Sequence, residues 1–391
     1  MSLMFGNTEV EIEGNHAVKE LLMDEYSLLK SDKSKNTQVR FNFQTGRLKP
    51  EEDSLTVDDL EMGKLYLKGN TIRIIRDSGS SFISKLEHFI GSTFWDISLN
   101  EHPYDSNKLE VEVFCDPNAI PEPFWRKAMH SALKKVNWSY SSRIEMTTEN
   151  ITYNVIEPIL HVYMLKNSQT FLHSSGVVSD SEDAILFTGW GGVGKSSACV
   201  QLVNHGDWKY LADDVIIINA NGEAYCYPKK VLLYGYNTEG NSNLEEKLLK
   251  NDLINRLSWN LRKKILGGAK VRRRISPALL FGRDKIGTKG KISKVFYLLR
   301  SNSGKSSAQE ITSEEIAERS VSVIAYILKE FCEVVNAIHA VNPKNPSLEE
   351  VLEKNKLIYE RAFKNSECYL YYVPHNATPP KVIEGIERYI K

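Results

Sequence analysis

The chain has 391 residues, 41% hydrophobic and 26% charged, and its 50 basic and 50 acidic side chains give a formal net charge of zero. This composition is typical of a globular protein of about two or three domains. The balanced charge gives no argument for binding nucleic acid or a membrane, and no run of about 18 apolar residues indicates a membrane span. The first residues lack a signal-peptide pattern, so we expect a cytoplasmic protein. Five scattered cysteines without a CxxC pair indicate neither disulfides nor zinc.

The first 150 residues carry strand patterns but no motif that indicates a function. Alternation of apolar and polar residues at period two predicts antiparallel strands at 37–43, 64–76 and 108–114. The acidic run over 50–61 is expected to be a solvated loop, and 121–136 is expected to form a helix. We therefore predict an α+β accessory domain over 1–150.

A second domain is predicted over 151–391. A helical pattern over 150–166 is followed by strand-like segments, by a hairpin turn at Asn221-Gly222 and by the strand KVFYLLR. Long helical patterns near 313–340 and 347–364, each after a capping box, predict a helical extension over about 313–364. A last strand and a last helix are expected to complete the core. The sequence thus predicts an α/β fold with a mixed sheet.

The stretch GWGGVGKSS, residues 189–197, fits the phosphate-binding pattern G-x-x-x-x-G-K-[ST] at every fixed position, with a predicted strand before it and a helix after it. Such a loop turns its backbone N–H groups toward a phosphate at a helix N-terminus. Lys195 is expected to reach the β- and γ-phosphates of ATP, and the Ser196 hydroxyl to bind Mg²⁺. The candidate nucleotide-binding residues are Gly189, Gly191, Gly192, Val193, Gly194, Lys195, Ser196 and Ser197.

Two aspartates and a histidine are further candidates. Asp213 and Asp214 end a short predicted strand after the loop, where one could hold Mg²⁺ and the other take a proton from an attacking hydroxyl. Adjacent strand residues point to opposite faces, so both reach one site only if the strand ends or twists there. A surface turn is the alternative. His173 lies on a predicted strand, where a single histidine is usually structural.

The order LHSSGVV, ILFTGWGGVGKSS and HGDWKYLADDVIII is similar to the catalytic domain of the HPr kinase/phosphorylase family. The later segments AYCYPKK, VRRRIS and YLYYVPH resemble elements of its diverged bacterial relatives. The resemblance covers about residues 155–391, discontinuously. It implies the phosphoenolpyruvate carboxykinase-like fold, that is, a mixed-sheet P-loop kinase core.

Within this resemblance, Lys195 and Ser196 match the family's phosphate-loop residues, and His173 matches its strand histidine. Asp213 matches the catalytic base and Asp214 the metal ligand, with the reverse assignment left open. The glycine-rich segment that follows in true HPr kinases has no match here, so a different hydroxyl acceptor is expected, on a protein or a small molecule.

The triple arginine Arg272, Arg273 and Arg274 ends the one basic cluster of the chain. It could contact the transferred phosphoryl group or an acidic acceptor, or form a solvated loop. The sequence therefore predicts a Mg²⁺-ATP-dependent kinase. A non-catalytic ATP- or GTP-binding module and carboxykinase-type chemistry on a small acid are the alternatives. No nucleic-acid or membrane partner is expected, and homo-oligomerisation is left open.

Overall fold

The computed structural model describes residues 2–14, 16–31, 37–76, 95–116, 143–238, 242–249, 253–268, 270–375 and 377–390. The chain forms two compact units. The first unit comprises Met1–Glu122, Ser141–Thr170 and Ile324–Ile358, and the second unit comprises Pro123–Tyr140, Phe171–Val323 and Tyr359–Lys391. A single boundary near residue 150 therefore does not describe the units, because the chain returns to the first unit after residue 323. The helix expected at 121–136 lies outside the described residues. None of the described helices has the length and hydropathy to cross a membrane.

The first unit is built on one mixed sheet. Its strand order is β3-β1-β2-β4-β9-β8-β7-β6-β5, with β2, β4 and β9 parallel and the other neighbours antiparallel. Alternate residues of β4 and β9 are buried, as expected for strands with one face on a core. Its strands are β1 Ser2–Phe5, β2 Thr8–Gly14, β3 Lys30–Ser31, β4 Val39–Gln44, β5 Leu55–Leu60, β6 Gly63–Lys68, β7 Thr71–Ile75, β8 Trp95–Leu99 and β9 Leu109–Cys115.

Helices of the first unit pack on this sheet, with α11 against β5 and β6 and α1 against β2 and α4. A single π-turn joins α4 to α5. The helical segments of this unit are α1 Ala17–Glu25, η1 Ser27–Leu29, α4 Arg143–Ile151, the π-turn Thr152–Ile156, α5 Glu157–Leu165 and α11 Lys329–Val341.

Two expectations from the sequence are corrected here. The acidic run over 50–61 is not a loop throughout, because Leu55–Leu60 forms β5, the last strand of the sheet. Charged residues on an edge strand oppose pairing with another chain, and they hide the strand signal in the sequence. The helix expected over 313–340 is two helices, α10 (Ser313–Ile327) and α11, which meet at Leu328. No glycine or proline marks this break.

The second unit is built on another mixed sheet, of order β10-β14-β15-β18-β12-β11-β13, with β20 paired to β18 and β19. The predicted α/β class with a mixed sheet is confirmed, since β12, β18 and β20 run parallel, whereas β11 is antiparallel to β12 and β13, β15 to β14 and β18, and β19 to β20. Its strands are β10 Gln169–Leu172, β11 Ser174–Val178, β12 Asp183–Gly189, β13 Lys209–Ala212, β14 Ile216–Asn219, β15 Glu223–Tyr225, β18 Lys289–Ser301, β19 Ser307–Glu310 and β20 Glu367–Pro374.

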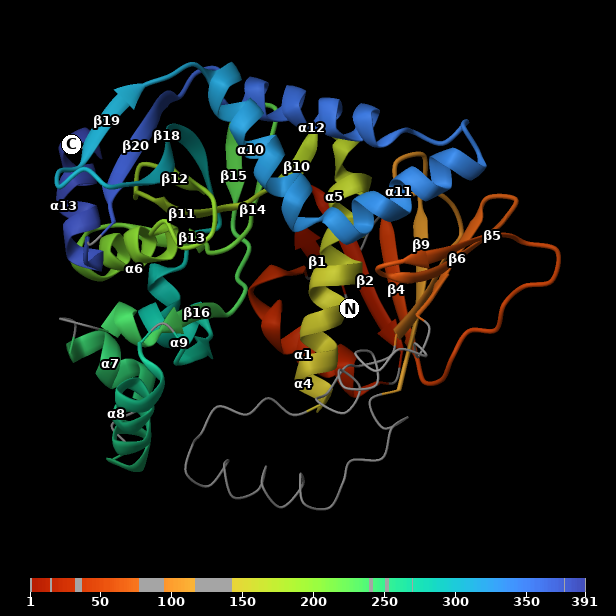
Figure 1. Cartoon of the computed structure of the whole chain (residues 1–391), viewed down its shortest axis with the longest axis horizontal. Helices are drawn as coiled ribbons and strands as arrows, with labels where there is room; N and C mark the ends of the chain where they lie inside the picture. Colours follow the sequence, from red (N-terminus) through yellow and green to blue (C-terminus); the bar gives the residue numbers. More distant parts are fainter. Residues whose placement is uncertain are drawn as a thin grey trace. The chain divides into compact units, whose positions relative to one another are not determined.

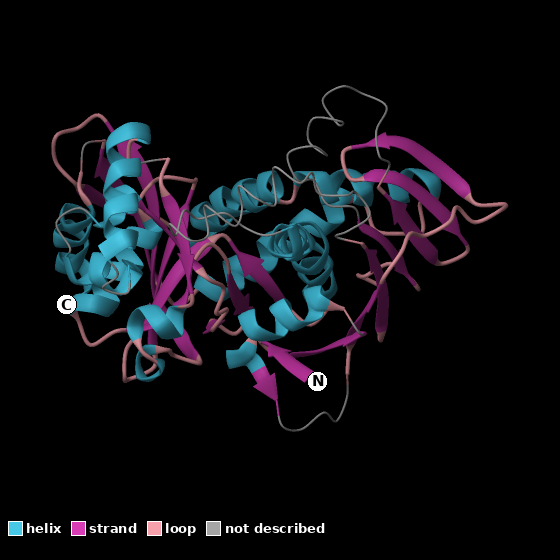
Figure 2. Ribbon diagram, turned by 90° about the horizontal axis from the view of Figure 1, so that it is seen from below, coloured by secondary structure: helices cyan, strands magenta, loops and turns pink. Residues whose placement is uncertain are grey.

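Helices α6 and α13 of the second unit pack side by side at this sheet (Figure 1), and Figure 2 shows helices near the C-terminus lying along its strands. The second unit also contains a two-stranded antiparallel ribbon, which pairs β16 (Val231–Tyr234) with β17 (Arg272–Ile275). The helical segments are α6 Lys195–His205, η3 Gly235–Thr238, α7 Ser242–Leu249, α8 Leu253–Leu266, α9 Pro277–Phe281, η4 Arg283–Lys285 and α13 Pro379–Ile390. Two helices belong to both units: α10 passes into the first unit at Ile324, and α12 (Leu348–Phe363) is in the first unit up to Ile358.

Aromatic side chains in register hold the three parallel strands together. Phe187 of β12, Phe296 of β18 and Tyr369 of β20 are cross-strand neighbours, and their rings stack at centroid distances of 5.7 and 5.2 Å. Such pairs stabilise a sheet beyond the area that they bury. They fix the end of β12, at which the glycine-rich loop begins.

Candidate active site

The loop over 189–197 connects the end of β12 to the start of α6, as the sequence predicts. Gly194 is the N-cap of α6 in the left-handed region (φ 110°), and no side chain caps the helix. The N-terminal N–H groups of a helix without a side-chain cap suit an anion. Gly191 and Gly192 are exposed, whereas Val193 is buried in the core beneath the loop.

Gly189 is required by its conformation and its surroundings. Its φ is 125°, and a Cβ atom there would lie 2.6 Å from the backbone oxygen of Leu298 on β18. We expect Gly189→Ala to lower the free energy of unfolding by about 1–3 kcal/mol or more and to displace the loop. Gly191→Ala is the matched control, because Gly191 has an ordinary φ and nothing within 4 Å of an added Cβ. Chemical denaturation of both variants measures the difference, and equal stabilities would contradict the expectation.

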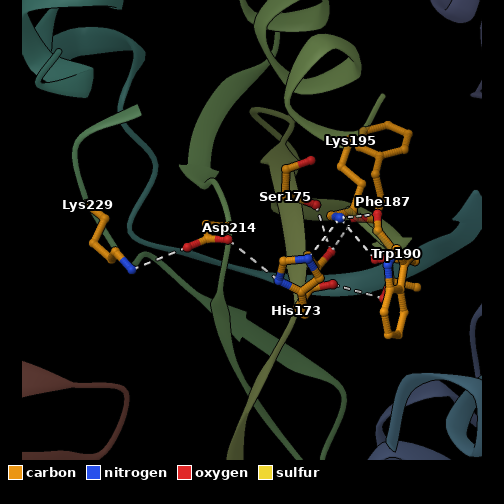
Figure 3. Close-up of polar contacts among 10 residues, drawn as sticks. His173, Ser175, Phe187, Trp190, Lys195, Asp214 and Lys229 are labelled. Carbon is orange, nitrogen blue, oxygen red and sulfur yellow. Dashed lines mark hydrogen bonds and ion pairs between the residues drawn. The ribbon is translucent and has the colours of Figure 1, made fainter. Parts of the chain in front are cut away.

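Lys195 is the first residue of α6 and is buried, with its ammonium folded back over the loop. Nζ donates to the backbone oxygens of Gly189 (2.9 Å) and Trp190 (2.8 Å), and to Nε2 of His173 (2.9 Å), as Figure 3 shows. Because Nε2 accepts this bond, the proton of the neutral imidazole is on Nδ1. The structure thus brings His173 and Lys195 into direct contact.

Asp213 and Asp214 follow β13, and the backbone turns between them. Asp214 has a φ of 76°, in the left-handed region, so the two carboxylates do not have to point to opposite faces as they would on a strand. Asp213 is buried, and the nearby Ser196 side chain acts to lower its pKa. Oδ1 of Asp214 lies 3.6 Å from Nδ1 of His173, and its Oδ2 lies 3.4 Å from Nζ of Lys229 (Figure 3).

The surroundings shift the pKa values of Asp213 and Asp214 in opposite directions. Burial, followed by the neighbouring charge of Asp214, raises the pKa of Asp213 to about 6, against the hydrogen bond from Ser196. Burial would also raise the pKa of Asp214, but Lys229 and the other basic groups around it outweigh that effect and lower its pKa. Asp213 therefore changes its charge close to neutral pH, whereas Asp214 stays ionised.

The pKa values of His173 and Lys195 are shifted as well. Burial and the nearby Lys195 lower the pKa of His173 to about 4, so that this histidine is neutral at pH 7. Burial lowers the pKa of Lys195 to about 8, although Asp214 and Asp213 oppose the shift. A lysine, a neutral histidine and two unlike carboxyl groups thus share one site.

Two of the predicted residues have structural partners instead. Ser197 accepts a hydrogen bond from the side chain of Asn237 (3.0 Å), which holds η3 against the start of α6. Arg273 donates to the backbone oxygen of Leu248 and lies over the ring of Trp259, 5.9 Å from its centroid. Arg272 and Arg274 alternate with Arg273 on β17 and face the other side of the ribbon.

The structure adds residues that the sequence reasoning missed. Lys229 is 3% exposed and holds Asp214, and Arg300 donates to the backbone oxygens of Gly192 (3.2 Å) and Pro374 (2.9 Å). Arg300 thereby ties the loop to the end of β20. The sequence could have indicated Arg300, because it is the polar residue near the carboxyl end of the buried strand KVFYLLR. Ligand sites are commonly found at such strand ends.

Comparisons with known proteins give little beyond this geometry. No family model matches the chain, and no curated protein matches it. Among solved structures, one match is the Hpr(Ser) kinase/phosphatase from Coxiella burnetii, at 11% sequence identity and a TM-score of 0.27. That match covers 56% of this chain and 96% of the other. At these values the likeness is distant, and the roles of residues rest on this chain's own geometry.

Proposed function

We propose that the protein transfers the γ-phosphate of Mg²⁺-ATP to a hydroxyl group, on a protein serine or on a small molecule. One observation carries the proposal: a buried phosphate-loop lysine and a buried aspartate with a pKa of about 6 share one site with a second, ionised aspartate. Phosphoryl transfer to a hydroxyl needs these groups, namely a cation for the phosphates and a base for the proton.

The residues present fit a magnesium nucleotide. Oδ1 of Asp213 is buried and has no hydrogen-bond partner within the described part of the chain, as expected for an atom that awaits a ligand or a proton. The 189–197 loop and Lys195 would hold the triphosphate. The Ser196 hydroxyl and Asp214 would hold Mg²⁺, with phosphate oxygens completing its coordination. Bound Mg²⁺ would supply positive charge against the phosphates.

The chain's own residues would act on the proton. Asp213 would take the proton of the acceptor hydroxyl as its oxygen bonds to the γ-phosphorus and the bond to the β–γ bridging oxygen breaks, releasing ADP. Lys195 would stabilise the charge on the phosphate oxygens. His173, which accepts a hydrogen bond from Lys195, would position this ammonium, and Lys229 would hold Asp214.

The shifted pKa values predict a bell-shaped pH profile. As pH rises through about 6, Asp213 loses its proton and can act as a base, so kcat/KM increases. As pH rises through about 8, Lys195 loses its proton and its charge, so kcat/KM decreases. Steady-state rates from pH 5 to 9 should show an optimum near neutrality. The Asp213→Asn variant should lack the acidic limb in its residual rate, and an unchanged limb would assign it to another group.

The direct test of the function uses γ-labelled ATP with Mg²⁺. Incubation with a metabolite panel and with a cell lysate should transfer label to at least one acceptor, and calorimetry should detect ATP binding. Binding without transfer to any acceptor would favour the non-catalytic nucleotide-binding module. Absence of binding would remove the loop's proposed role.

A further inference from the structure

Helix α8 carries a row of apolar side chains that point into solvent. Leu253, Leu257, Leu261 and Ile265 are 70, 62, 53 and 66% exposed. We call these four residues the α8 stripe. They recur at every fourth position, and each step of four advances about 40° around a helix, so that they form one continuous row. Four large apolar residues exposed in a row mark an interaction surface, whereas single ones do not.

The opposite face of α8 is already packed. Trp259 and Arg262 are 1 and 7% exposed, and Arg273 lies over the indole of Trp259. Helix α8 therefore has its inner face on the second unit, and the α8 stripe is its outer face. Figure 1 shows α8 beside α7. A surface helix ordinarily carries polar residues on its outer face, so the α8 stripe is unexplained by the folding of this unit.

The exposed charges of α8 itself are of one sign. Arg256 and Lys264 are exposed, and α8 contains no acidic residue from Leu253 to Leu266. At about 100° per residue, both cations fall on the same flank of the α8 stripe, and the other flank carries Ser258 and the buried Arg262. We propose that the α8 stripe binds an amphipathic helix of a partner protein, with acidic residues along one edge.

Two other occupants fit the observations less well. A second copy of α8 would bring only cations to the contact, and antiparallel pairing would place Arg256 of one copy beside Lys264 of the other. A helix that lies on an anionic membrane carries basic residues on the polar side around its apolar face and often an exposed aromatic residue. Here the exposed cations lie on one flank only, and the one aromatic residue of α8, Trp259, is buried.

The proposal is independent of phosphoryl transfer and is tested by binding alone. The probes are two labelled helical peptides with leucine at every fourth position, one with glutamate along one flank and one with lysine there. Fluorescence anisotropy with the full chain should show that the glutamate peptide binds at least about tenfold more tightly than the lysine peptide. Arg256→Glu with Lys264→Glu should reverse this preference.

Leu257→Asp with Leu261→Asp should weaken binding of the glutamate peptide by about tenfold or more, and both sites are exposed enough to leave folding intact. Leu55→Asp is the matched control, because Leu55 is 61% exposed but lies on β5 of the first unit. Equal binding of the two peptides, or no binding of either, overturns the proposal. The proposal is also overturned if the unmodified chain forms a dimer, or sediments with anionic vesicles, and Leu257→Asp with Leu261→Asp abolishes that behaviour.

Discussion

Asp213→Asn should slow phosphate transfer by roughly 10²–10⁴ while leaving the affinity for Mg²⁺-ATP largely unchanged. The amide keeps the shape of the side chain but cannot accept the proton of the attacking hydroxyl. Burial raises the pKa of Asp213 to about 6. A carboxylate with this pKa binds a proton strongly enough to act as a base near neutral pH. Single-turnover rates with saturating nucleotide, together with calorimetry, separate the two effects.

The same variant should be more stable than the unmodified protein at pH 7. The folded-state pKa of Asp213 is raised from 3.8 to about 6, so ionisation of this buried group opposes folding as pH rises through that interval. Replacing it with a neutral amide should remove a penalty on the order of 2–3 kcal/mol at pH 7 and give no such gain below about pH 4. If Asp213 had only a structural role, its replacement would not both raise the free energy of unfolding and abolish phosphate transfer.

Asp214→Asn is the matched comparison. Asp214 has a lowered pKa and contacts Lys229, so its loss should weaken the apparent affinity for Mg²⁺ and lower stability. If Asp213→Asn instead weakens Mg²⁺ binding and Asp214→Asn abolishes the chemical step, the two roles are exchanged. Because Ser196, the other candidate Mg²⁺ ligand, acts on the pKa of Asp213, this exchange is the specific outcome to examine.

The loop could be predicted from the sequence because its residues are contiguous and each has a stereochemical reason to be there. The backbone has a positive φ at Gly189 and Gly194, which favours glycine, and Lys195 is the first residue of helix α6. Lys229 could not be predicted in the same way. It reaches Asp214 from a segment fifteen residues further along the chain, and no spacing rule connects the two.

The division of the chain was also beyond the sequence. Helix α11 has an apolar face typical of any packed helix, and this pattern does not say which sheet it covers. The structure assigns it to the first unit, against β5 and β6, although it follows the elements of the second unit in the chain. The α/β class needed only local patterns, whereas the interleaved units depend on contacts between distant segments.

Lys195→Ala should weaken ATP binding by about tenfold to a hundredfold and lower kcat by about 10²–10³. The ammonium contributes a charge-assisted contact to the phosphates in the bound state and a larger one as charge moves during transfer. Its effect on stability has two opposing parts, because the variant takes a donor from Nε2 of His173 and from the backbone oxygens of Gly189 and Trp190 but also removes a buried charge whose pKa is lowered to about 8. Calorimetry and transfer rates measure the effects on binding and on kcat separately.

Lys195→Arg separates the positive charge from the position of the donor. Arginine keeps a positive charge and several donors, so nucleotide should still bind, but its planar fork cannot place a single donor where Nζ lies. Transfer should therefore remain low in the arginine variant even where nucleotide still binds. Nucleotide affinity in Lys195→Ala equal to that of the unmodified protein would overturn the assignment of Lys195. Full transfer by the arginine variant would show that only charge at this position matters, and the specific contact with His173 would lose its proposed role.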